Sequence, residues 1–367
     1  MKRISITGSR GVPGGHGGFE TFAENLALYL VKNGWLVTVY CQESLKDYQC
    51  VQESEWHGVK RVHIPVGRSG AIGTIIFDFL TIRHAAKVGG LILTLGYNTA
   101  AFNAWFRVKG VKNVINMDGI EWRREKWRWY EKAWLRLNER LGCLFGNHLV
   151  ADHPEIRARL QTLVRKDKVT MIPYGAREVT NASSALLKQY DLEPKKYAIV
   201  IARPEPENSV LEIVTAFSVK KRGCKLVILG NVDTSTSYQS MVIDAASDEV
   251  RFLGAIYDHD VLDALRFNAL LYVHGHKVGG TNPSLVEALG SGQPILAHDN
   301  VFNRWVAQSA AVYFDSSAAC ESMFDTLLAS PERLDSLAKE SRVRFASTFQ
   351  WSSILSQYES LISNILE

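Results

Sequence analysis

The chain has 367 residues, more than one ordinary hydrophobic core organises, so we expect two domains. Its hydrophobic content of 46% is typical of globular proteins, and its most apolar segment, residues 71–82, is short and interrupted by Asp78, so no membrane span is expected. Five scattered cysteines without disulfide or metal-ligand spacing favour a reducing cytoplasm, and the strand pattern that begins at Arg3 argues against a signal peptide.

The net charge of +4 is unevenly distributed along the chain. Residues 1–176 carry 25 Lys and Arg against 15 Asp and Glu, so acidic residues are in excess in the remainder. We expect the basic front half to meet an anionic partner, plain scatter of surface charge being the alternative. No nucleic-acid recognition motif accompanies the charge, so nucleic acid is not expected as a partner.

The front half begins like a nucleotide-binding fold. A strand at residues 3–7 precedes a glycine-rich loop at 10–18, and apolar residues from Phe19 then recur at helical spacing until Gly34. Further strands are expected at residues 36–40, 62–65, 91–95, 114–117, 148–151 and 169–173. Strands that alternate with helices predict a parallel, doubly wound sheet.

The same pattern restarts after Arg177. Strands are expected at residues 197–202, 225–230 and 270–274, with helices from about Ser209 and over 258–267. Residues 351–366 place apolar side chains on one face of a final helix. We therefore expect domains at 1–176 and 177–345, followed by a C-terminal segment, 346–367.

The segment from Val273 to Ala297 is the most informative, because it reads as strand, glycine turn, helix and strand. Asn282 suits a helix N-cap and Pro283 the first helical position. Gly279 and Gly280 allow a ligand to approach the backbone just before that helix, whose positive end suits a phosphate. Glu287 follows about one turn later, where a carboxylate could hold ribose hydroxyls, which together describes a nucleotide-sugar site.

Residues 279–289, Gly-Gly-Thr-Asn-Pro-Ser-Leu-Val-Glu-Ala-Leu, resemble the donor motif of retaining glycosyltransferases of family GT4, which have the GT-B fold. Residues 8–23, 118–127 and 202–208 resemble a narrower, rhamnosyltransferase-like branch with a DUF1972 N-terminal domain. The resemblance implies two Rossmann-like domains facing a cleft, with the C-terminal helix packing back on the first domain. It implies transfer, with retention, from a nucleoside-diphosphate sugar to a lipid-linked glycan of bacterial surface polysaccharide.

Two positions depart from the broad GT4 pattern. Gly279 stands where the first of two glutamates is expected, and Asn208 stands near the place of a phosphate-binding lysine. The resemblance assigns the diphosphate to Arg203, and either His276 or Lys277 could supply the missing positive charge. The full set expected at the donor is Gly17, Gly18, Arg203, His276, Lys277, Gly280, Thr281, Asn282 and Glu287.

The acceptor is expected on the first domain. Asp118 ends a strand and is expected to orient the acceptor hydroxyl, with Glu121 or His16; a cap for the next helix is the alternative. Catalysis is thus assigned to Asp118, Glu287 and Arg203. A dinucleotide loop is disfavoured, because Glu20 stands where Gly-x-Gly-x-x-Gly needs its last glycine.

Residues 121–145 combine apolar and basic stripes at helical spacing. Trp127, Tyr130, Trp134, Leu137 and Leu141 form the first, and Arg124, Arg128, Lys132, Arg136 and Arg140 the second. This mixture suits an anionic membrane surface, or else the apolar stripe is core.

We therefore expect a glycosyltransferase peripheral to the cytoplasmic face of the bacterial inner membrane. No metal or other cofactor is expected, because no Asp-x-Asp motif is present. A catalytically weak nucleotide-sugar-binding or scaffold protein and a nucleotide-sugar epimerase on the same fold remain as alternatives.

Overall fold

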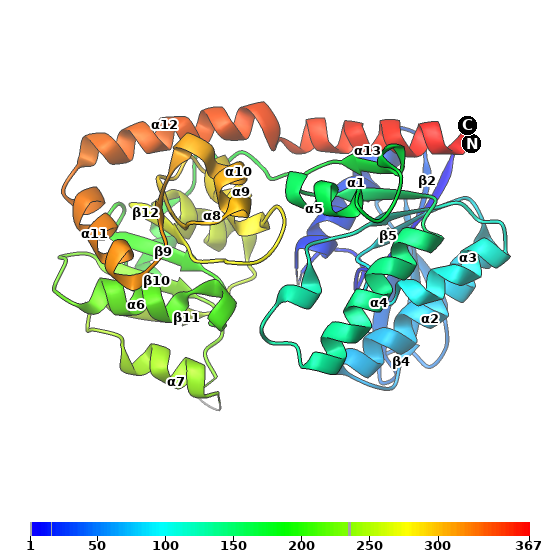
Figure 1. Ribbon diagram of the computed structural model, residues 1–367, viewed down its shortest axis with the longest axis horizontal. Helices are drawn as coiled ribbons and strands as arrows, with labels where there is room; N and C mark the ends of the chain where they lie inside the picture. The colour runs from blue at the N-terminus through cyan, green and yellow to red at the C-terminus, as the bar shows by residue number, and fades with distance from the viewer. Residues whose placement is uncertain (1, 16, 234–235) are drawn as a thin grey trace. The chain divides into compact units, whose positions relative to one another are not determined.

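The computed structural model describes residues 2–15, 17–233 and 236–367 (Figure 1). Contacts divide the chain into two compact units. Unit 1 runs to Arg123, resumes over Trp127–Pro173 and ends with Trp351–Glu367, whereas unit 2 comprises Arg124–Lys126 and Tyr174–Gln350. Each unit is built around one mainly parallel sheet, so the predicted α/β architecture of two Rossmann-like bodies is confirmed.

The sheet of unit 1 has eight strands in the order β3-β4-β2-β1-β5-β6-β7-β8. They are β1 (Arg3–Thr7), β2 (Leu36–Ser44), β3 (Gln52–Trp56), β4 (Val59–Val66), β5 (Leu91–Leu95), β6 (Asn113–Asn116), β7 (His148–Ala151) and β8 (Val169–Met171). Seven of these strands are parallel, and their side chains are largely buried, as expected for a sheet covered on both faces.

The antiparallel edge strand β3 was missed in the sequence. It pairs with β4 through a tight turn at His57 and Gly58, both with positive φ, which is the backbone that a two-residue hairpin requires. Glu53 and Glu55 face solvent on this edge, so the segment lacks the apolar run that marks the other strands.

The helices of unit 1 connect these strands. They are α1 (Gly18–Lys32), α2 (Gly70–Val88), α3 (Ala104–Val108), α4 (Trp129–Phe145), α5 (Pro154–Leu160) and α13 (Trp351–Leu366), with 3-10 turns η1 (Ala100–Asn103), η2 (Glu121–Arg123) and η3 (Lys166–Lys168).

The C-terminal helix α13 returns to unit 1, as predicted, and lies beside α1 (Figure 1). The ring of Tyr358 packs on Phe22 with centroids 4.7 Å apart. Trp35 donates from Nε1 to Glu359 at 2.9 Å, which fixes the helix along its polar edge. The last helix therefore completes the core of the first unit.

Unit 2 has a six-stranded parallel sheet in the order β11-β10-β9-β12-β13-β14. The strands are β9 (Tyr197–Ile201), β10 (Lys225–Leu229), β11 (Val250–Gly254), β12 (Leu271–His274), β13 (Ile295–His298) and β14 (Ala311–Phe314). The helices are α6 (Val210–Ser218), α7 (Ser237–Asp244), α8 (His259–Phe267), α9 (Pro283–Gly290), α10 (Val301–Ala307), α11 (Ser317–Leu328) and α12 (Pro331–Thr348), with 3-10 turns η4 (Ser184–Tyr190), η5 (Pro206–Asn208) and η6 (Gln308–Ala310). Buried apolar clusters on both faces of the sheet form its core.

Candidate active site

The turn between β12 and α9 has the local structure that the sequence predicts. The Asn282 side chain accepts a hydrogen bond from the backbone N–H of Ser284 at 3.0 Å, and Pro283 occupies the first helical position. A β-carbon at Gly279 would meet open space, so the loop before the helix is accessible to a ligand.

The first turn of α9 keeps its own amides occupied. Pro283 has no N–H, Ser284 donates to the Asn282 side chain, and Leu285 and Val286 both donate to the Asn282 carbonyl at 3.2 Å. A phosphate at this position would therefore meet the positive end of the helix and the backbone of the loop at 279–282, rather than the helical amides themselves.

Glu287 is held by an arginine that the sequence analysis did not select. Arg266, at the end of α8, donates from Nη2 to Glu287 Oε2 at 2.7 Å and lies 3.6 Å from Asp263. Arg266 is 4% exposed, whereas about a third (33%) of the Glu287 side chain is exposed. One carboxylate oxygen is thus anchored from inside the domain. The signal in the sequence was Asp263-x-x-Arg266, an ion pair at helical spacing on the buried face.

Arg203 follows β9 and is free to meet a ligand. Its side chain is 67% exposed, and its ion pair with Glu205 is long, at 3.7 Å. Asn208 is buried and donates from Nδ2 to the Arg203 carbonyl at 2.8 Å. The residue that stands near the place of a lysine therefore shapes the loop that carries Arg203, and it brings no charge.

Lys277 is engaged in an ion pair. Its Nζ lies 2.9 Å from Glu212 Oε1, and its backbone N–H donates to the Glu207 carbonyl at 2.8 Å. The positive charge of Lys277 is thus partly neutralised within unit 2.

His276 is one of the two candidates for the missing positive charge. Burial, together with the charges of Arg124 and Arg203, lowers the pKa of its imidazole to about 3. The ring stacks on His274 with centroids 4.4 Å apart, and its Nδ1 has no hydrogen-bond partner among the described residues. The lowered pKa favours an uncharged imidazole at His276, which leaves Lys277 as the candidate for the missing positive charge.

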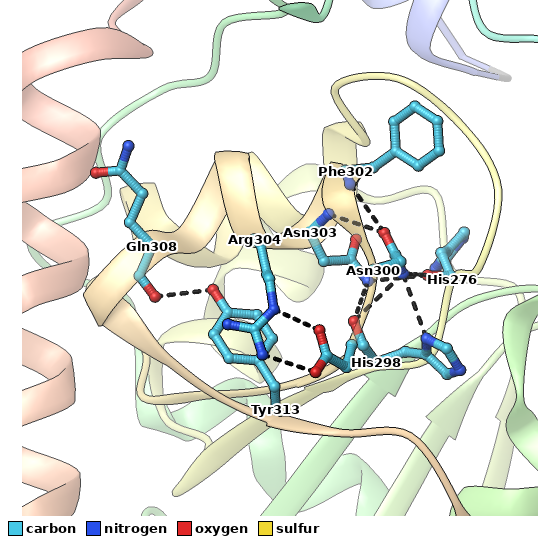
Figure 2. A network of polar contacts seen from close by, with 9 residues as sticks. His276, His298, Asn300, Phe302, Asn303, Arg304, Gln308 and Tyr313 are labelled. Carbon is cyan, nitrogen blue, oxygen red and sulfur yellow. Dashed lines mark hydrogen bonds and ion pairs between the residues drawn. The ribbon is translucent and has the colours of Figure 1, made fainter. Parts of the chain in front are cut away.

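A polar network fixes the backbone around His276 (Figure 2). Its carbonyl accepts from Asn300 Nδ2 at 3.0 Å and from Asn303 Nδ2 at 2.9 Å. Asn300 also caps α10, because its side-chain oxygen accepts from the backbone N–H groups of Phe302 and Asn303. The end of β12 is thereby tied to the start of α10, which holds the following glycine loop in place.

In unit 1, Asp118 follows β6 and has a left-handed backbone. Its φ is +51°, which is uncommon outside glycine and marks functional positions more often than others. Its N–H donates to Asn116 Oδ1 at 2.9 Å, and Asn116 Nδ2 donates to the Tyr358 hydroxyl at 2.9 Å. The C-terminal helix thus helps to hold the turn that carries Asp118, which is half-buried.

Glu121 and His16 are the two other residues expected at the acceptor. Glu121 lies in η2 and is 7% exposed, and its backbone N–H donates to the Tyr97 hydroxyl at 3.0 Å. Its position suits a supporting role better than direct contact with an acceptor. His16 lies outside the described residues.

The glycine loop before α1 is occupied by the helix's own carboxylates. Glu20 accepts from the backbone N–H of Arg10 at 2.9 Å, and Glu24 accepts from that of Gly14. A β-carbon at Gly17 would lie 2.9 Å from Glu20, so the glycine makes room for this carboxylate. With Gly18 as its first residue, α1 presents acidic side chains where a phosphate at Gly17 and Gly18 was expected.

The core interpretation of the apolar stripe at residues 121–145 is wrong. Helix α4 begins only at Trp129, and Tyr130, Trp134 and Leu137 are exposed. Its buried face carries instead Leu135, Asn138, Glu139, Gly142 and Cys143. The basic stripe is also shorter than expected, because only Lys132, Arg136 and Arg140 lie on the helix.

The exposed aromatic face of α4 is part of a wider surface. Trp129 is 81% exposed, and Trp105 and Val108 on the neighbouring α3 are also exposed. Helix α3 contacts both α2 and α4 (Figure 1). Within the described ranges, no helix combines the length and apolar composition that crossing a bilayer requires.

Comparison with protein families accounts for nearly the whole chain. Residues 1–177 match the domain of unknown function DUF1972, and residues 185–344 match the glycosyl transferases group 1 family. The chain therefore combines a DUF1972 domain with a glycosyl transferases group 1 domain. No curated protein matches it.

Solved structures share the fold of this group 1 glycosyltransferase over its full length. Sucrose-phosphate synthase from Thermosynechococcus elongatus superposes with a TM-score of 0.81 at 17% identity, covering 100% of this chain and 99% of that one. Anabaena HepE in complex with UDP gives 0.74 at 14% identity, covering 99% and 100%. An α,α-trehalose-phosphate synthase (UDP-forming) from Burkholderia vietnamiensis gives 0.73 at 11% identity, covering 99% and 100%. These likenesses establish the GT-B fold.

Proposed function

We propose that this glycosyltransferase moves a sugar, with retention, from a nucleoside-diphosphate sugar to a lipid-linked oligosaccharide of bacterial surface polysaccharide. Rhamnose is the first sugar to test. The observation that carries the proposal is the arrangement in unit 2 of an Asn282-capped helix start and, within the same short helix, a Glu287 carboxylate anchored by buried Arg266. Anabaena HepE, which has the same fold, was solved with UDP.

We assign each group of the donor site to one part of the nucleotide sugar. The loop at 279–282 and the positive end of α9 receive the diphosphate, and Thr281 lies buried within that loop. The free oxygen of Glu287 accepts from ribose hydroxyls. Arg203, exposed and only weakly paired, supplies the guanidinium that stabilises the leaving diphosphate. Lys277 adds charge if the ligand draws it from Glu212.

Because His276 is uncharged, its proposed role is not to bind the phosphate as a cation. An uncharged imidazole with an unpartnered Nδ1 can exchange one hydrogen bond with a sugar hydroxyl. His276 is therefore proposed to contact the transferred sugar.

On the acceptor side, Asp118 orients the attacking hydroxyl, and Glu121 and His16 are proposed as its supports. In a transfer with retention on one face of the donor, the departing phosphate oxygen takes the acceptor proton, so no separate protein base is required. Neither a metal nor another cofactor enters this scheme, because Arg203 and the dipole of α9 meet the charge of the diphosphate.

We further propose that unit 1 lies on the cytoplasmic face of the inner membrane. The exposed Trp129, Tyr130 and Trp134 provide interfacial aromatic side chains, and Lys132, Arg136 and Arg140 on the same helix favour anionic headgroups. Flotation with anionic and zwitterionic liposomes tests this directly. Binding only to anionic vesicles, lost at high salt, supports the proposal, and no binding at low salt refutes it.

A donor screen followed by turnover tests the enzymatic proposal. A panel of UDP-, dTDP- and GDP-sugars is screened by thermal shift, since a ligand at a hundred times its dissociation constant adds about 2.7 kcal/mol of apparent stability. The best donor is then incubated with membrane-extracted acceptor lipids, and the anomeric configuration of the product is read by NMR. Binding without any nucleotide release would identify a scaffold, and a changed sugar without acceptor would identify an epimerase.

A further inference from the structure

Unit 1 contains a cavity that borders the glycine loop before α1 and that the proposed donor site in unit 2 does not use. It measures about 950 Å³ and lies at the carboxyl ends of β1, β2 and β4. Neither Asp118 nor Glu121 lines it. Its volume is at the upper end of ligand pockets, so it has room for much more than a single phosphate.

Four cationic side chains line this cavity: Arg10, Lys46, Arg61 and Arg68. None of them forms an ion pair with a carboxylate in the part of the chain that the structure describes. Two carboxylates also line the cavity, and both already accept hydrogen bonds. Glu20 accepts from the backbone N–H of Arg10 at 2.9 Å, and Glu43 accepts from His63 Nδ1 at 2.7 Å. The cavity therefore has an excess of positive charge, which an anionic ligand would satisfy.

Hydrogen bonds hold the Arg61 side chain in place, which favours binding of an anion. Its Nε donates to Ser54 Oγ at 3.0 Å, and Ser54 Oγ lies 2.7 Å from His63 Nε2. His63 is 4% exposed and stacks on Tyr48 with ring centroids 4.8 Å apart. The chain from Glu43 through His63 and Ser54 thus fixes the half-buried guanidinium, and little conformational freedom is lost when it binds an anion.

The cavity adjoins the start of α2, whose N-cap Ser69 makes no side-chain capping hydrogen bond and whose first turn has no acidic residue. The positive end of this 19-residue helix adds to the field of the arginines. Along its length α2 exposes an apolar face that consists of Ile72, Ile75, Ile76, Phe79 and Leu80. An anion site therefore leads directly onto an apolar surface.

We propose that this cavity binds the phosphate or diphosphate that joins the acceptor glycan to its lipid, with the lipid lying along the exposed face of α2. The inference rests on the proposed function, because it identifies the acceptor's linkage. A phosphate group held by Arg10, Arg61 and Arg68, followed by a hydrocarbon chain, fits this sequence of cationic and apolar surface. A phosphate on a water-soluble acceptor would contact only the cationic surface and not the apolar face of α2.

Binding of three probes, measured by calorimetry with UDP at saturation, tests the proposal. Saturating UDP fills the donor site, so the probes report on the second site. The probes are inorganic pyrophosphate, farnesyl diphosphate and glucose 1-phosphate. We expect farnesyl diphosphate to bind at least tenfold more tightly than either soluble probe. Equal affinity of farnesyl diphosphate and glucose 1-phosphate, or no binding of any probe, would overturn the lipid-phosphate assignment.

Variants then locate the binding. Arg61→Gln and Arg68→Gln should each weaken farnesyl diphosphate binding about tenfold, since a charge-assisted hydrogen bond contributes roughly this much. Arg68 is exposed, so its variant keeps the test valid should Arg61→Gln fail to fold. Arg157→Ala, an exposed arginine on α5 that does not line the cavity, is the charge-matched control.

The result separates this inference from the proposed function. Unchanged farnesyl diphosphate affinity in both cavity variants refutes the cavity site, whereas failure of the unmodified protein to bind UDP, dTDP and GDP alike would refute the donor site. Ile76→Gln should lower the advantage of farnesyl diphosphate over pyrophosphate and leave pyrophosphate itself unaffected. An unaltered advantage would contradict the placement of the lipid on α2.

Discussion

The buried guanidinium of Arg266 donates to the carboxylate of Glu287 at 2.7 Å. This contact joins the end of α8 to the middle of α9 and directs one carboxylate oxygen inward. About a third (33%) of the Glu287 side chain stays exposed, in the same short helix whose start we assign to the diphosphate. Arg266 is therefore a positioning residue, since it acts on the nucleotide through Glu287.

Replacing Arg266 should weaken nucleotide binding more than it slows chemistry. In Arg266→Gln the Glu287 carboxylate loses its anchor, and we expect UDP affinity to fall about tenfold, with a smaller change in kcat at saturating donor. Arg266→Lys keeps the charge but lacks the planar guanidinium with its several N–H donors, and should recover only part of the affinity. Calorimetry with UDP measures both variants. Arg304→Gln, an exposed arginine paired with Asp299, is the control; equal affinities in all three variants would contradict the role of Arg266.

Asp118→Asn should reduce turnover by orders of magnitude and leave UDP binding intact, because the carboxylate is assigned to the acceptor hydroxyl. Initial rates and UDP calorimetry on the same preparation check both statements. Turnover at the level of the unmodified protein would show that Asp118 has another role.

The backbone at Asp118 allows a second measurement. Because its φ is +51°, Asp118→Gly should be more stable than Asp118→Ala by about 1 kcal/mol. Urea denaturation of the two variants gives the difference. A glycine variant less stable than the alanine variant would mean that the left-handed conformation is not kept in solution.

The lowered pKa of His276 predicts that the folded protein loses stability in acid. Its folded pKa, about 3, lies below its ordinary value of 6.5, so the unfolded chain binds the extra proton between these values. Stability contributed by the neutral ring is present above pH 6.5 and is lost as the pH falls towards 3, at up to about 1.4 kcal/mol per pH unit. Urea midpoints between pH 4 and 8 should fall less steeply in His276→Gln. The exposed His259→Gln is the control, and parallel curves for all proteins would exclude His276 as the cause.

Trp129→Ala should lower affinity for anionic liposomes about tenfold without loss of stability, because the side chain is 81% exposed and contributes only at the interface. Tyr257→Ala removes a comparably exposed aromatic side chain from unit 2 and should leave liposome binding unchanged. If the two variants float equally well, the aromatic face of α4 does not bind membranes.

The fold was predictable because its strands are continuous apolar runs followed by glycine turns. The sheet positions of Ile4 and Ile199, for example, are wholly buried, as their neighbours in sequence indicate. The edge strand β3 was not predictable in this way, because its alternating glutamates resemble a loop.

Helix α4 shows why hydrophobic periodicity failed in one place. The core alternative would have placed Trp134 inward, but the buried face holds Asn138 and Glu139, with Glu139 paired to Arg159 at 2.6 Å. The Asn138 side chain accepts from the Ala101 amide at 2.9 Å. Buried polar groups that find partners from distant segments leave no local signal.

A crystal structure with bound UDP or dTDP would locate the nucleotide. We expect the diphosphate against the backbone at residues 279–282 and ribose hydroxyls within hydrogen-bond distance of Glu287, whose other oxygen remains on Arg266. A nucleotide bound away from Asn282 and Glu287 would contradict this expectation.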